Sequence, residues 1–177
     1  VKSIDEAVEG ASYIIAEWIS DNAYYRKWIR SYFFKNGVII SKMKKDAVDD
    51  GKIYEMYYDY QESIKSIKPH RVLALNRGEK EKVLTISIDV NKDEIFAYLD
   101  KKVIKNEKSF VTDTVRLAIR DSYKRLISPS VEREVRAELS LKGEEAAIAN
   151  FGKNLEALLL TPPMKEQVVL AFDPGYV

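Results

Sequence analysis

A strict alternation of apolar and polar residues near the middle of the chain is the feature that most constrains its fold. From Leu84 to Val90 every second residue is Leu, Ile or Val, and the residues between them are Thr, Ser and Asp. A period of two predicts a β-strand with one buried face. A strand needs a hydrogen-bonding partner, and the short β-branched segment Val38–Met43 is the best candidate. The sequence therefore predicts a small two-stranded β element whose strands lie far apart along the chain.

Helical spacing of apolar residues dominates the rest of the chain as far as residue 160. Proline and glycine mark the expected ends. Pro69 suits the first turn of a helix that Gly78 ends, and Ser128-Pro129-Ser130 makes a sharp break before the last helix. The predicted helices span residues 3–20, 21–35, 53–67, 69–78, 91–104, 110–127 and 131–160. The expected fold class is mainly α, a helical domain with the small two-stranded β element.

The first predicted helix carries signals for both its start and its buried face. Ser3 and Glu6 form a capping-box pair, in which the hydroxyl satisfies a free backbone N–H. Apolar residues follow at spacings of four and three, so we expect one stripe of them to be buried. This stripe consists of Ile4, Val8, Ala11, Ile15 and Trp18. We expect Asp21 to cap the next helix.

Composition excludes several classes of protein. The 177 residues suit one domain, or one domain with a fragment of a second, and the net charge of +1 argues against a surface that is basic throughout. With no cysteine and a single histidine, His70, the chain lacks the side chains for disulfides, thiolate metal sites or a multi-histidine zinc site. No apolar run is long enough for a membrane span. We expect no metal, no cofactor, no membrane partner and a reducing, cytoplasmic setting.

The pattern of apolar residues changes after Thr161-Pro162-Pro163, which should end the last helix. Val168–Phe172 is a continuous apolar run that leads into Asp173-Pro174-Gly175. Such a run is typical of a strand buried on both faces at the opening of an α/β domain. We expect a central helical domain over residues 1–163 and the truncated start of a second domain over 164–177. The strand should find no sheet to join, and the chain should be an internal piece of a longer protein.

Three stretches resemble, in the same order, the Tex family of bacterial transcription accessory proteins. They read HRVLALNRGEKE at 70–81, DSYKRLISPS at 121–130, and, after Asn154-Leu155 and Pro162-Pro163, FDPGY at 172–176. The resemblance implies that residues 164–177 begin a ribonuclease-H-like, YqgF-type domain. Helix-hairpin-helix and oligonucleotide-binding barrel domains would follow. It also implies that the parent protein binds RNA or DNA and contacts the transcription machinery, and that this segment is a structural and positioning module.

Two other functions remain open from the residues alone. Asp173 ends a strand where ribonuclease-H-like nucleases place a metal ligand, so the chain would be a fragment of a metal-dependent nuclease. Two-metal chemistry needs several converging carboxylates, however, and no companion is evident, so we expect Asp173 to form a turn. The other alternative is a free-standing helical protein-interaction domain. We expect no catalytic residue and no small-molecule substrate, and we expect His70 to cap or pack.

The best candidates for a nucleic-acid contact lie in one short segment. They are Arg71, Arg77, Lys80 and Lys82. Their cations would neutralise phosphates, and Gly78 would let the backbone approach a partner closely. Glutamates alternate with these cations, so binding through this surface should be weak, non-specific and dependent on salt.

Two further patterns have a structural and a nucleic-acid interpretation. The helices on either side of Ser128-Pro129-Ser130 could form a helix-turn-helix that presents Arg133 and Arg136 to DNA. Acids on the same helix favour a structural hairpin, in which Arg125 and Arg133 pair with carboxylates. The tyrosines could stack on bases, but their helical spacing favours the core and rim of a packed face. They are Tyr54, Tyr57, Tyr58 and Tyr60.

Overall fold

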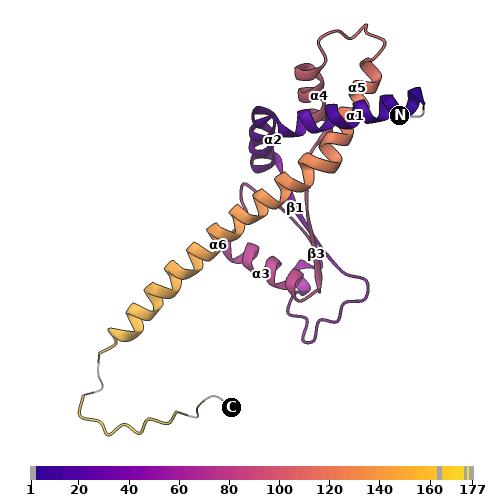
Figure 1. Cartoon of the computed structure of the whole chain (residues 1–177). Helices are drawn as coiled ribbons and strands as arrows, with labels where there is room; N and C mark the ends of the chain where they lie inside the picture. The colour runs from indigo at the N-terminus through magenta and orange to yellow at the C-terminus, as the bar shows by residue number, and fades with distance from the viewer. Residues whose placement is uncertain (1–2, 163–164, 174, 176–177) are drawn as a thin grey trace.

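The computed structural model of the chain describes residues 3–162, 165–173 and 175. Figure 1 shows the helices and strands. In chain order they are α1 (Ile4–Asp21), α2 (Ala23–Asn36), β1 (Val38–Met43), the 3-10 turn η1 (Glu55–Tyr57), β2 (Asp59–Ser63), α3 (Pro69–Lys80), β3 (Leu84–Asp89), α4 (Lys92–Val103), α5 (Thr112–Asp121), the π-helical segment η2 (Ser122–Ile127) and α6 (Ser128–Leu159). The fold class is mainly α, as the sequence predicts.

The molecule has a helical end and a sheet end, and α6 joins them. In Figure 1 α1, α2, α4 and α5 gather at the top, while the strands and α3 lie lower down. Helix α6 packs against η2, α2 and α3, and α3 packs against β3. No helix in the described part of the chain combines the length and the apolar character that crossing a bilayer requires.

The predicted pairing of the two strands is confirmed. β1 and β3 run antiparallel, with Ile39 opposite Ile88. Ile39 and Ile88 are buried, as the alternation predicts. The edge of β3 is covered by α6, because the backbone N–H of Ile88 donates to Glu132 Oε1 at 3.0 Å. A side chain of the long helix thus satisfies a backbone group that an edge strand would otherwise leave open.

The sheet has a third strand that the sequence did not reveal. β2 pairs antiparallel with the other edge of β1, which gives the strand order β2-β1-β3. The prediction of a helix over residues 53–67 is therefore wrong. The apolar residues of this segment recur at helical spacing, but the free edge of β1 selects the extended conformation for Asp59–Ser63. Strand formation here depends on a long-range partner more than on local preference.

Helix α1 begins as predicted but buries a different face. The Ser3 side chain accepts a hydrogen bond from the backbone N–H of Glu6 at 3.2 Å. Ala16 and Ile19 are buried, whereas Ile4 and Trp18 are 83% and 73% exposed. The small residue at 16 allows close contact, since the buried Ser122 hydroxyl donates to its carbonyl oxygen at 2.6 Å. Of the predicted stripe, Ile15 packs partly against the core, whereas Ile4, Val8 and Trp18 face solvent.

The predicted break at Ser128-Pro129-Ser130 is absent. The chain continues from α5 through η2 into α6, and the Ser128 N–H bonds to the Tyr123 carbonyl, five residues back. Proline normally clashes with the carbonyl four residues before it. The wider π turn shifts the hydrogen-bond register, so Pro129 sits in the first turn of α6 without ending the rod. Both the helix-turn-helix and the hairpin interpretations are therefore wrong.

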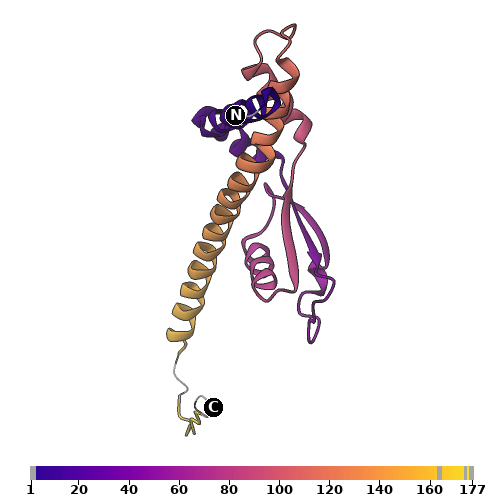
Figure 2. The same ribbon diagram turned by 45° about the vertical axis from the view of Figure 1, so that its right-hand side comes forward.

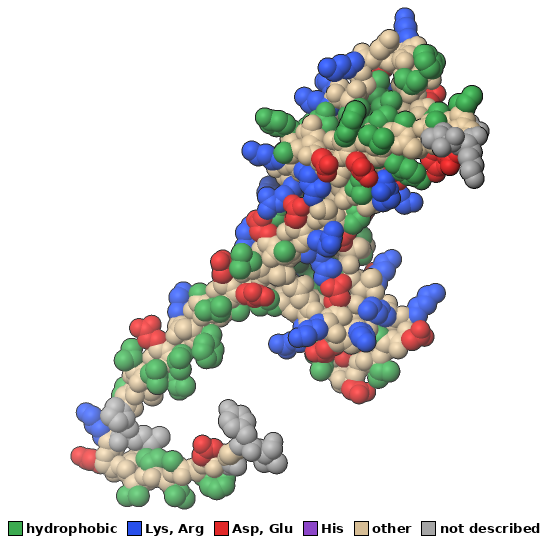
Figure 3. Space-filling model, viewed as in Figure 1, with side chains coloured by type: hydrophobic (Ala, Val, Ile, Leu, Met, Phe, Trp, Pro, Cys, Tyr) green, Lys and Arg blue, Asp and Glu red, His purple; other side chains and the backbone are tan. Residues whose placement is uncertain are grey.

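Helix α6 has a packed half and a projecting half. Its 32 residues span about 48 Å. Val131, Val135 and Leu139 are buried, and Gly143 packs against Leu73. Beyond Gly143 the side chains are exposed, apart from a partly covered alanine (Figures 2 and 3).

The end of the chain joins no sheet. Val168–Phe172 is exposed and forms no strand, in agreement with the expectation. Helix α6 ends at Leu159, just before Thr161-Pro162, as predicted. Pro163 and Pro174 lie outside the described residues. The division into two domains stays a prediction.

The tight contact at Gly78 gives a stability test. A Cβ added there would lie 2.6 Å from Leu84 Cδ1 and 2.9 Å from Leu84 Cγ, and Leu84 is fully buried. We predict that Gly78→Ala lowers the free energy of unfolding by about 1–2 kcal/mol in urea titrations, because overpacking outweighs the better helix propensity of alanine. Gly10→Ala is the matched control, since nothing lies within 4 Å of its Cβ position. The packing claim is wrong if both variants are equally stable.

Candidate nucleic-acid interface

Arg71, the first of the predicted phosphate-binding residues, is partly exposed and is held by contacts with β2. Its Nη1 lies 2.9 Å from Glu62 Oε1 and within 3.5 Å of the Tyr60 hydroxyl, which also donates to Glu62. Burial alone would raise the pKa of Glu62, but the hydrogen bonds from Tyr60 and Arg71 outweigh it and lower that pKa. Burial, followed by the neighbouring Glu62, raises the pKa of Tyr60 to about 12. Arg71 therefore fastens α3 to β2 and lies at the opposite end of α3 from the other candidates.

The remaining candidates meet two lysines that the sequence did not connect with them. Arg77, Lys80 and Lys82 are exposed around the turn from α3 into β3. The backbone N–H of Lys44 donates to the Val83 carbonyl at 2.9 Å, which brings the exposed Lys44 and Lys45 to the same place. We call this group the α3–β3 basic cluster: Arg77, Lys80, Lys82, Lys44 and Lys45.

The glutamates interleaved with this cluster are engaged elsewhere. Arg136 on α6 makes a two-point contact with Glu79, through Nη1 at 3.1 Å and through a shorter bond from Nη2. Burial raises the pKa of Tyr54, and a hydrogen bond to Glu81 adds to the effect. Arg136 therefore offsets the charge of Glu79, whereas Glu81 keeps its negative charge next to the cluster.

Gly78 has a structural role in place of the expected functional one. It is buried inside α3, which continues past it to Lys80, and its open side is filled by Leu84 and Tyr54. Close approach of the backbone therefore serves internal packing, and no ligand can reach the α carbon of this glycine.

Other residues predicted as possible binding sites make contacts within the fold. Arg125 pairs with Asp121 at 2.8 Å, as expected, while Arg133 Nε donates to the Pro129 carbonyl at 3.2 Å. Tyr54 and Tyr57 are buried, and Tyr58 donates to Asp49 at 2.8 Å. The tyrosines thus form core and rim, although on a turn and a strand and not on the predicted helix.

His70 and Asp173 occupy exposed positions. His70 lies in the first turn of α3, whose N-cap carries no side-chain hydrogen bond, so the histidine is not a cap. Asp173 Oδ1 accepts from the Gly175 N–H at 2.9 Å, which is the expected turn chemistry. Among the residues that the structure describes, no three His, Asp or Glu side chains are placed to hold one metal ion.

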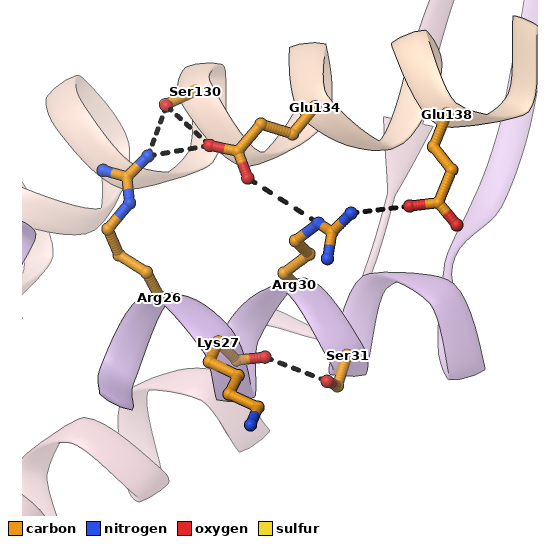
Figure 4. A network of polar contacts seen from close by, with 7 residues as sticks. All are labelled: Arg26, Lys27, Arg30, Ser31, Ser130, Glu134 and Glu138. Carbon is orange, nitrogen blue, oxygen red and sulfur yellow. Dashed lines mark hydrogen bonds and ion pairs between the residues drawn. The ribbon is translucent and has the colours of Figure 1, made fainter. Parts of the chain in front are cut away.

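A polar contact network fixes α2 along α6 (Figure 4). Arg26 lies 3.0 Å from Glu134, and it also donates to Ser130. Arg30 bridges the next turn, at 3.7 Å from Glu134 and 2.6 Å from Glu138. These side chains are partly exposed, so each pair contributes at most about 1 kcal/mol, but together they define the register of the two helices.

The sequence also missed a surface between α2 and α4. Tyr25 and Trp28 pack partly against the core, and they also line an open groove together with Tyr98. Helical periodicity indicates that an aromatic stripe meets another surface, but not that a groove remains beside it. Aromatic residues interleaved with lysines on α2 were the available signal.

The fold defines a mainly α domain built around one long helix. Residues 1–151 match the family described as Tex central region-like, so the chain belongs to the Tex family, and the resemblance seen in the sequence is confirmed.

Relatives with similar sequences agree with this assignment. Over 97% of its length the chain is 53% identical to the uncharacterized protein YdcI of Bacillus subtilis (strain 168), of which it covers 24%. It is 30% identical to S1 RNA-binding domain-containing protein 1 of Homo sapiens, over 94% of the chain and 18% of that protein. It is 28% identical to Protein tex of Bordetella pertussis, over 96% of the chain and 23% of that protein. The chain thus spans about a quarter or less of the length of these relatives.

Phosphate binding by the α3–β3 basic cluster can be tested with duplex DNA, because the faces of its bases are covered by stacking and its phosphates are exposed. We expect the 177-residue chain to bind with a dissociation constant of roughly 10⁻⁴ M or weaker near physiological salt. Combined charge reversal, Arg77→Glu with Lys80→Glu, should weaken binding further and flatten the salt dependence by a slope of about 2. The titration is run by fluorescence anisotropy at two salt concentrations.

The matched control reverses Lys105 and Lys108, which lie exposed in the loop between α4 and α5 at the other end of the molecule. It changes the net charge equally. An equal loss in the control would show that only total charge matters, and tight, sequence-selective binding that survives salt would contradict the assignment of a weak, non-specific surface.

Proposed function

We propose that this chain is the structural and positioning segment of a nucleic-acid-binding transcription accessory protein. The observation that carries the proposal is the division of α6. Its first half is packed into the domain, and its second half projects for 16 residues, from Glu144 to Leu159, as a single helix. A rod of this kind holds whatever it contacts at a fixed distance and orientation from the domain.

The physical basis is helix nucleation. An isolated helix of 16 residues is marginal in water, because forming its first turn is unfavourable. The packed half of α6 supplies that nucleus, so the projecting half extends it at no further nucleation cost. The exposed apolar residues of the projecting half give it a face with which to contact other parts of a longer protein; they include Ile148, Phe151, Leu155 and Leu158.

The nucleic-acid association is proposed for the full-length protein. Support comes from the names of relatives, which include a transcriptional accessory protein Tex from Neisseria gonorrhoeae and an S1 RNA-binding domain-containing protein. Within this segment Arg77, Lys80 and Lys82 would add a weak phosphate contact, whereas Arg71 would act structurally through Glu62. We propose RNA or DNA and the transcription machinery as partners, a cytoplasmic location and no enzymatic role, in preference to a metal-dependent nuclease using Asp173 or a free-standing interaction domain.

A proline in the projecting half of α6 tests the positioning role in the full-length protein. Ala147 is exposed, so Ala147→Pro should kink the rod without disturbing the packed core. We expect a changed maximum dimension in small-angle scattering and weaker RNA binding by the full-length protein.

The control Ala147→Ser keeps the backbone N–H and should leave both measurements unchanged. If the proline variant shows altered scattering but binds RNA as tightly as the unmodified protein, α6 does not position the binding domains and the proposal fails. Unchanged scattering would contradict the rigid connection itself.

A further inference from the structure

An aromatic groove between α2 and α4 remains outside every role assigned so far. It has a volume of about 570 Å³, within the range of roughly 300–1,000 Å³ that small-molecule sites occupy. Tyr24, Tyr25 and Trp28 line it from α2, and Tyr98 lines it from α4. Four aromatic rings in one open groove are a costly arrangement for a surface that has no ligand.

The rings are already organised relative to one another. Trp28 and Tyr98 stack with ring centroids 3.8 Å apart and planes 5° apart. Tyr25 meets Tyr98 edge-on, with centroids 6.3 Å apart at 88°. Tyr24 is 81% exposed and makes none of these contacts, so its ring face is open to a ligand. The groove therefore combines a fixed aromatic wall with one free ring at its mouth.

The charged residues that line the groove are both lysines. Lys27 projects from α2, and Lys102 lies 6.0 Å from the centroid of the Tyr98 ring. In the part of the chain that the structure describes, no carboxylate oxygen lies within 4.0 Å of either ammonium nitrogen. Figure 4 shows that Lys27 leads away from α6, whereas Arg26 and Arg30 on the same helix turn toward it and are neutralised there.

We propose that this groove binds unpaired bases of single-stranded nucleic acid, with Tyr24 stacking on a base and Lys27 and Lys102 contacting the flanking phosphates. Aromatic faces next to unneutralised cations are the combination with which proteins hold single strands without reading their sequence. The base faces of a duplex are covered by stacking. A proline-rich peptide could pack on the aromatic rings, but it would offer no anionic group to the two lysines. Charge complementarity therefore selects the single strand.

The site deepens the proposed function, because it names a nucleic-acid contact within this segment. It lies on the helical end of the molecule, whereas the α3–β3 basic cluster lies beyond the sheet. Its test changes no residue of α6 and does not use the full-length protein, so the groove and the positioning role can fail separately.

Fluorescence of Trp28 provides a direct readout. The chain has two tryptophans, and Trp18 is 73% exposed on α1, so Trp18→Phe leaves Trp28 as the sole reporter. We expect a single-stranded oligonucleotide of about 12 nucleotides to quench Trp28, a length within the range of about 4–16 nucleotides that one oligonucleotide-binding barrel covers. In this background Tyr24→Ala should weaken binding roughly 5- to 150-fold, the range for loss of one stacking ring, and Tyr24→Phe should retain it. Lys27→Glu should weaken binding and reduce its salt dependence.

Phe110→Ala is the matched control, because Phe110 is 98% exposed and lies in the loop before α5. It should bind like the parent. Equal binding by Tyr24→Ala, or an equal loss in the Phe110 control, would overturn the proposal. Quenching of Trp28 by a proline-rich peptide but not by the oligonucleotide would also overturn it and assign the groove to a protein partner.

Discussion

The packed stripe of α6 is the contact on which the rest of the structure depends. Val131, Val135 and Leu139 follow one another at intervals of four and are buried between the helical end and the sheet end. Burying side chains of this size contributes about 1.5–3 kcal/mol each. The partly exposed ion pairs from Arg26 and Arg30 contribute less, and their main effect is to fix the register of α2 along the same helix.

Helix α6 connects the helical end of the molecule to its sheet end. Glu132 covers the open edge of β3, and Arg136 holds the end of α3 through Glu79, so consecutive turns of α6 bind successive parts of the sheet end. On the other side η2 carries the rod into the helical end, where Ser122 bonds to α1. Because the first half of α6 is packed against both ends, the direction of its projecting half is fixed relative to the domain. The fold therefore supports the proposed positioning role.

The sequence predicts features that depend on local chemistry. The alternation around β3, the cap at Ser3 and the first-turn proline of α3 are all found, because each is decided by neighbouring residues. β2 was missed because its strand character comes from the free edge of β1. The buried face of α1 was misplaced because the choice depends on the close approach of Ser122. Of the candidate site, the exposed cations could be predicted, but the pairing of Arg71 with Glu62 could not, since it requires β2.

Amide hydrogen exchange along α6 in the 177-residue chain tests the central claim most directly. If the packed half anchors the rod, amides from about Val131 to Gly143 should exchange only through global unfolding, while those beyond Gly143 should exchange faster through fraying from the end. Protection should therefore fall in a step near Gly143. Uniform protection along the whole helix, or equally fast exchange in both halves, would contradict the account of α6 as an anchored rod with a free half.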